Sequence, residues 1–145
     1  MAVLEFKSYT VNELSYRKND LYKETNQNIS INPKIEIKNT PRQDKIIVTV
    51  DVHIGSLAEK KNPFIVTASV SGEFVYHEKE DHNQVGIDTL IKKNAVAILY
   101  PYVRSLVSGI TNASNQFPAL ILPTINVAQL LDEQSNRATF IVGKI

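Results

Sequence analysis

Apolar and polar residues alternate with a period of two over much of the first half of the chain. In the segment 45–54, KIIVTVDVHI, every second residue from Ile46 to Ile54 is a β-branched apolar residue, and most positions between them are polar. This period places the apolar set on one face of a strand, against a layer of helices. Comparable runs at 34–38 and 64–76 predict two further strands.

The segment 3–16 alternates less regularly and predicts an outer strand of the same sheet. Its apolar residues change phase near Lys7 and Ser8, which indicates a bulge or bend there. Short polar segments at 41–44 and 58–62 have the composition of turns, so consecutive strands should pair antiparallel. We therefore expect a four-stranded antiparallel sheet.

The pattern changes to a helical period between Ala95 and Ile110. At 100° per residue the apolar residues form a wide stripe, which predicts a heavily buried helix. A proline inside this segment should kink its first turns. The opposite face carries small residues and could receive a second layer; it consists of Ala97, Pro101, Ser105 and Ser108.

A proline-flanked apolar segment, FPALILPT, follows at 117–124. Two prolines around four apolar residues exclude a helix interior or a central strand, so this segment should be an extended crossing connector. Thr124 or Asn126 can cap a short second helix that follows it. The predicted fold class is therefore α+β, with one domain over residues 1–145.

Composition excludes several classes of function. The chain has 16 basic and 15 acidic residues and no cysteine, so it has no strong nucleic-acid footprint, no disulfide and no thiolate chemistry. The N-terminal residues lack the basic lead and apolar core of a signal peptide, and no apolar run approaches the length of a membrane span. We expect a cytoplasmic protein without membrane insertion.

The candidate chemistry is sparse. His77 and His82 bracket Glu78, Glu80 and Asp81, a set of metal-ligand types, but a solvated charged turn explains this cluster better. There is no glycine-rich phosphate loop and no nucleophile elbow. We therefore expect no enzyme, no cofactor and no resident metal, and we interpret the chain as a binding protein.

The second half of the chain contains three characteristic segments in order: Tyr100-Pro101-Tyr102-x-Arg104, then Phe117-Pro118-x-Leu120-x-Leu122-Pro123, then Ile125-Asn126-Val127-x-x-Leu130-Leu131. In these segments the chain resembles the SecB family of bacterial export chaperones. The resemblance implies a four-stranded antiparallel sheet, a long helix, a Pro-flanked crossover connector and a short second helix. It also implies a homotetramer built as a dimer of dimers.

The resemblance implies where subunits and clients would bind. Subunit contacts are expected near Val66, Ala68 and Val70, and on the small-residue face of the helix. Unfolded polypeptide clients would bind in an exposed apolar groove without ATP. Its expected residues are Leu21, Tyr22, Ile29, Ile31, Ile35, Ile37, Phe117, Leu120, Ile121, Val127, Leu130 and Leu131. Plain core packing is the alternative for each of these residues.

Some residues depart from the family pattern. SecB proteins present carboxylates on the sheet to the export motor SecA; Glu13 remains at one such place, whereas Arg17 and Thr67 occupy others. These departures argue against a SecA-type motor as partner. Two alternatives to an export chaperone stay open: a chaperone dedicated to one partner, such as an antitoxin, and a regulatory or small-ligand module whose groove is closed by the tail at 138–145.

Overall fold

The described residues form one four-stranded antiparallel sheet and one long helix. The structure is a computed structural model that describes residues 3–23, 33–42, 45–55 and 62–122. The strands lie in the order β1-β4-β3-β2, so β1 is at one edge, as predicted, and β2 is at the other. Their bounds are β1 Leu4–Lys18, β2 Pro33–Arg42, β3 Lys45–Ile54 and β4 Phe64–Tyr76.

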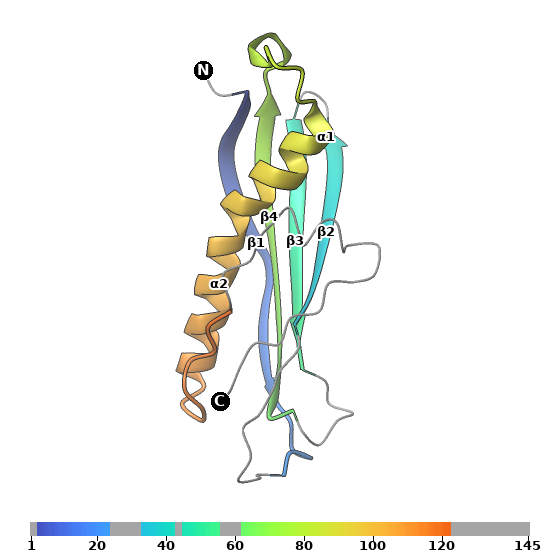
Figure 1. Cartoon of the computed structure of the whole chain (residues 1–145). Helices are drawn as coiled ribbons and strands as arrows, with labels where there is room; N and C mark the ends of the chain where they lie inside the picture. The colour runs from blue at the N-terminus through green and yellow to red at the C-terminus, as the bar shows by residue number, and fades with distance from the viewer. Residues whose placement is uncertain (1–2, 24–32, 43–44, 56–61, 123–145) are drawn as a thin grey trace.

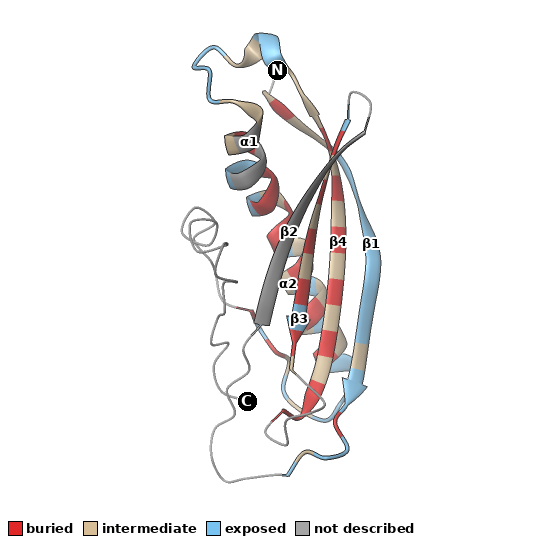
Figure 2. Cartoon of the chain, turned by 90° about the vertical axis from the view of Figure 1, so that its right-hand side faces the viewer, coloured by how far each residue is buried: buried red, intermediate tan, exposed pale blue. Residues whose placement is uncertain are grey.

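Helix α2 (Val96–Ala113) packs on one face of the sheet and forms the core with it (Figure 1). β3 and β4 alternate between buried and half-buried residues along nearly their whole length (Figure 2). The buried set includes Val48, Val50, Val70 and Phe74. The period-two pattern thus predicted the bounds of both central strands and the face that meets the helix.

Strand β1 contains two β-bulges. The register against β4 shifts between Phe6 and Ser8, as expected, and again between Val11 and Glu13. Each bulge inserts one residue and restores the phase of the side chains that follow. Consequently the apolar residues of β1 all stay on the helix side of the sheet, although their spacing in the sequence alternates between two and three.

The helical region begins before the predicted boundary. A short helix α1 (Ile87–Leu90) leads through a π turn (Ile91–Ala95) into α2, which continues through Pro101 to Ala113. π turns commonly interrupt α-helices as single turns, and this one lies just before the proline-containing part of α2. The buried stripe of α2 runs along Val96, Leu99, Tyr100, Val103, Val107 and Thr111.

Asp81 organises the loop between β4 and α1. Its carboxylate accepts hydrogen bonds from the backbone N–H groups of Val85 and Gly86 and from the Tyr76 hydroxyl, each at 2.9 Å. The bond from Gly86 chiefly, with those from Val85 and Tyr76, lowers the pKa of Asp81 below its usual value. Within the described ranges, no three potential ligand residues are grouped closely enough to hold a metal ion.

Helix α2 is not a membrane span. Among the described residues, no helix combines the length and the apolar character needed to cross a bilayer.

Candidate binding surface

The connector after α2 alternates between buried and exposed residues. Leu120 and Leu122 are core residues, whereas Ile121 between them is 60% exposed. Phe117 is half-buried at the start of the same segment. The connector therefore contributes to the core with every second side chain and presents an apolar side chain to solvent in between.

Two side chains of α2 hold the backbone of this connector. Nε of Arg104 donates a hydrogen bond to the carbonyl oxygen of Leu122 at 3.0 Å. The buried hydroxyl of Thr111 accepts a hydrogen bond from the N–H of Leu120 at 2.8 Å. Leu120 bonds Thr111 near the end of the helix, and Leu122, further along the connector, bonds Arg104 nearer the helix start. The connector therefore runs back along α2, antiparallel to it (Figure 1).

An aromatic cluster extends from the connector to the end of the sheet. It consists of Tyr16, Tyr22, Phe64 and Phe117, whose successive ring centroids are 5.4, 5.8 and 5.9 Å apart in the order Tyr16–Phe64, Phe64–Phe117 and Phe117–Tyr22. These separations lie in the range of favourable aromatic pairs. Phe64 is fully buried and the other rings are half-buried, so the cluster joins the core to the surface.

Buried Asn19 places the neighbouring chain segment beside this cluster. Its Nδ2 donates to the carbonyl oxygen of Asn62 at 2.7 Å, and its Oδ1 accepts from the N–H of Leu21 at 3.1 Å. An Asn side chain that bonds the N–H two residues later makes an Asx turn. This turn leaves Leu21 57% exposed next to Tyr22 of the cluster. The sequence signal for this turn is the pair Asn19-Asp20, because both residue types favour turns.

A second apolar surface lies on β1. Tyr9, Val11 and Leu14 are 46, 40 and 36% exposed, although the two bulges keep them on the helix side of the sheet. Tyr9 stacks on Tyr102 of α2 with ring centroids 4.2 Å apart. We call these three β1 residues the β1 strip. Figure 2 shows β1 exposed along most of its length, in contrast to β3 and β4.

This sheet, with its long helix and antiparallel connector, has counterparts among known proteins. Residues 4–138 match the family described as preprotein translocase subunit SecB. The chain belongs to the SecB family. An α+β SecB fold with an antiparallel sheet and one long helix is thereby confirmed, whereas the predicted second helix lies outside the described residues.

Relatives of this SecB-family chain occur in archaea and bacteria. An uncharacterized protein of Methanocaldococcus jannaschii is 33% identical over 132 residues, covering 88% of this chain and 82% of that protein. The protein-export protein SecB of Anaplasma phagocytophilum is 30% identical over 87 residues, covering 60% of this chain. That match spans 54% of the Anaplasma protein, about half of its length.

Two solved structures share the fold. One is a SecB-like chaperone of Mycobacterium tuberculosis in complex with a peptide from an antitoxin, with TM-score 0.65, 15% identity and coverage of 84% of this chain and 90% of that one. The other is a protein of unknown function from Streptococcus agalactiae, with TM-score 0.52, 16% identity and coverage of 83% and 97%. At these identities the likeness concerns the fold alone.

The structure brings together some of the residues predicted for client binding. Leu21, Tyr22, Phe117 and Ile121 lie at or next to the aromatic cluster or on the connector that leads from it. For Leu120 the alternative of plain core packing fits better: it is 4% exposed, and Thr111 holds its backbone so that its side chain lies in the core. Ile35 and Ile37 pair with Val52 and Val50 through the β2 backbone. Outside the described residues lie Ile29, Ile31, Val127, Leu130 and Leu131.

The subunit contact expected near Val66, Ala68 and Val70 stays a prediction. Val66, Ala68 and Val70 are fully buried within this single chain, because the alternation of β4 points them into its own core. On α2, by contrast, Ala97, Pro101 and Ser105 are exposed and Ser108 is half-buried, so that face remains open to a partner. The β1 strip was not predicted.

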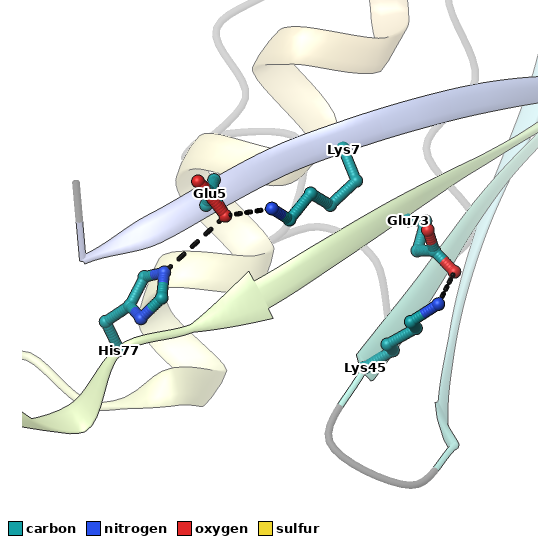
Figure 3. Close-up of polar contacts among 5 residues, drawn as sticks. All are labelled: Glu5, Lys7, Lys45, Glu73 and His77. Atoms are coloured by element: carbon teal, nitrogen blue, oxygen red, sulfur yellow. Dashed lines mark ion pairs between the residues drawn. The ribbon is translucent and has the colours of Figure 1, made fainter. Parts of the chain in front are cut away.

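The outer face of the sheet is polar but not strongly acidic. Hydroxyls follow its centre: Asn12 Nδ2 donates to Ser71 Oγ at 2.7 Å, and Ser71 Oγ lies 2.6 Å from Thr49 Oγ1. Its carboxylates are partly paired, with Glu5 beside Lys7 and His77, and Glu73 beside Lys45 (Figure 3). Lys7 chiefly lowers the pKa of Glu5. Such exposed pairs contribute little stability but reduce the negative potential of the face.

Proposed function

We propose that this protein is an ATP-independent holdase that binds unfolded polypeptide segments at the surface formed by Leu21, Tyr22, Phe117 and Ile121. The observation that carries the proposal is the contact between the Tyr22 and Phe117 rings, which joins two chain segments that each carry a well-exposed aliphatic side chain, Leu21 on one and Ile121 on the other. Membership of the SecB family supports it. Fully burying an aliphatic or aromatic side chain is worth about 1.5–3 kcal/mol, so a few client side chains can supply useful affinity without sequence specificity.

Assembly into a tetramer is part of the same proposal. The β1 strip lies on an edge strand, and an edge that combines exposed apolar side chains with an open row of backbone groups favours pairing with another chain. The exposed small-residue face of α2 permits close approach of a second pair of subunits. Several client surfaces on one assembly would act multivalently, so modest local affinities combine into a longer-lived complex.

Two kinds of client fit this surface. A SecB relative is named as a protein-export protein, which supports preproteins as clients. A structural neighbour is a SecB-like chaperone bound to a peptide from an antitoxin, which supports a single dedicated partner. The hydroxyl-rich outer face favours the second candidate, because it lacks the strongly acidic character expected for docking an export motor. Either role belongs in the cytoplasm.

Suppression of aggregation tests the holdase proposal. A reduced, unrelated protein should remain in solution when an equal amount of the assembled protein is present without ATP. The double substitution Leu21→Ser and Ile121→Ser should reduce this protection at least several-fold, because both side chains are exposed and contribute apolar area rather than core packing. Light scattering over time provides the measurement.

The matched control is Val85→Ser. Val85 is another exposed apolar residue, in the loop between β4 and α1, at the opposite end of the sheet from Leu21 (Figure 1). This variant should protect the client as well as the unchanged protein does. Full protection by the double variant, with an unchanged solution mass, would mean that clients bind elsewhere.

A further inference from the structure

Two side chains of α2 fix the connector that carries Ile121. Arg104 donates to the carbonyl of Leu122, and Thr111 accepts from the N–H of Leu120. The two helix residues are seven apart and lie on the same side of α2, about 10.5 Å apart along its axis at about 1.5 Å per residue. The two connector residues span about 6.6 Å in an extended chain, and the long Arg104 side chain covers the difference.

The Thr111 hydroxyl uses both of its hydrogen-bonding functions. It donates to the carbonyl oxygen of Val107 at 2.8 Å and lies 3.2 Å from that of Ser108. A hydroxyl has a single hydrogen, which one of these helix carbonyls takes, and its lone pairs accept the N–H of Leu120. A threonine in the last turns of a helix commonly bonds its own backbone. Thr111 differs in that its hydroxyl also accepts a hydrogen bond from Leu120, which lies outside the helix.

The connector is thereby held on both sides of Ile121. Leu120 and Leu122 are each fixed by one backbone hydrogen bond and by burial of the side chain. Because side chains alternate along an extended segment, this arrangement leaves a single orientation for Ile121, which is outward. The backbone at this place is set before any partner arrives.

We propose that Thr111 and Arg104 are positioning residues for client binding, which fix the connector so that Ile121 is presented to an unfolded client in advance. This inference rests on the proposed holdase function. Neither side chain needs to touch the client. Their contribution is preorganisation, because a segment already ordered in the free protein loses less conformational freedom when it binds.

Substitutions at Thr111 separate positioning from packing. Thr111→Val keeps the shape of the side chain but removes the hydroxyl, so the N–H of Leu120 loses its acceptor. Thr111→Ser keeps the hydroxyl and loses only a methyl group. The Leu120 amide should exchange its hydrogen faster in the valine variant and should stay protected in the serine variant.

Client affinity is the decisive readout. The probe is a fluorescently labelled, reduced and carboxymethylated α-lactalbumin, which stays unfolded, and its dissociation constant is measured by anisotropy. Thr111→Val should bind it about tenfold more weakly, which corresponds to about 1.4 kcal/mol, with a faster dissociation rate. Thr111→Ser should stay within about twofold of the unchanged protein. Arg104→Met should resemble the valine variant, because it keeps an apolar stem and loses the donor.

A control for general destabilisation is Val48→Ala, which removes buried methyl groups from β3 and leaves the connector untouched. This variant should lose stability but keep client affinity. If Thr111→Val binds the probe as tightly as the unchanged protein, or no more weakly than Val48→Ala, the positioning role is rejected while the holdase function stands. If the unchanged protein does not bind the probe, the proposed function fails and the positioning role fails with it.

Discussion

Gly72 lies in β4 directly beneath α2, where even one methyl group has no room. A Cβ added there would come within 2.6 Å of Leu99 Cδ2 and 2.7 Å of Phe74 Cε2. Both neighbours are fully buried, so neither can move aside without disturbing the core. The residue thus lets the helix approach the sheet closely at this point.

The close approach at Gly72 predicts opposite effects for two glycine substitutions. Gly72→Ala should lower the free energy of unfolding by about 1–3 kcal/mol through overpacking. Gly109→Ala, in the exposed part of α2 with nothing near its Cβ position, should raise it by about 0.5–1 kcal/mol. Urea denaturation provides both values. Equal effects at the two positions would contradict the role of space at Gly72.

Among the elements, agreement between sequence and structure follows the strength of the local signal. β3 and β4 were predicted to the residue because their alternation is uninterrupted. The second bulge of β1 was missed, since Asn12 and Glu13 are both polar and give no sign of which one is extra. Its consequence, the exposed β1 strip, was missed with it.

The connector illustrates a different limit of the sequence. Its prolines excluded a helix interior or a central strand, and residues 118–122 are in neither, but nothing in the sequence separates its buried from its exposed apolar residues. Which of them are buried depends on Thr111 and Arg104, partners 9 and 18 residues away. Neither partner can be identified from the connector alone, so for Leu120 the sequence left both groove lining and core packing open.

At the loop between β4 and α1, the structure predicts a dependence on pH. The pKa of Asp81 is lower in the folded protein than its usual value of 3.8, so the ionised carboxylate stabilises the fold above that value. This stabilisation is lost as the pH falls through the folded pKa. Asp81→Asn should therefore be less stable than the unchanged protein at pH 7, and the difference should shrink as the pH is lowered from about 5 towards 2.

Thermal unfolding across this pH range checks the prediction. Glu80→Gln, which removes a carboxylate from the same loop and leaves the three hydrogen bonds to Asp81 in place, serves as the control. Its stability should differ from that of Asp81→Asn at neutral pH. A constant gap between Asp81→Asn and the unchanged protein at every pH would show that ionisation of this carboxylate does not contribute.

On the scale of the whole molecule, the β1 strip leads to a prediction about the proposed assembly. Substituting Val11→Lys and Leu14→Lys together should shift the solution mass to smaller species, because two charges would be placed against apolar area at the edge of the sheet. Sedimentation at a fixed protomer concentration measures the effect.

The control for assembly is Val85→Lys, which adds one charge at an exposed apolar position in the loop after the end of β4, whereas Val11 and Leu14 pair with Val70 and Ala68 further back along that strand. Its solution mass should equal that of the unchanged protein. An unchanged mass for the β1 double variant would exclude the strip from the interface and leave the small-residue face of α2, around Ala97 and Ser105, as the remaining candidate.

The pairing of the first strand with the last has a consequence for how the chain is made. β1 ends at Lys18, but its partner β4 begins only at Phe64 and must be synthesised before the two can pair. At about 5–20 residues per second, the ribosome leaves β1 without that partner for several seconds. Helix α2 and its connector, whose contacts are short in sequence, can form soon after they emerge. Until β4 has been made, the nascent chain is itself an unfolded polypeptide with an unpaired strand. The yield of folded protein should therefore depend on how many other copies of the nascent chain are nearby.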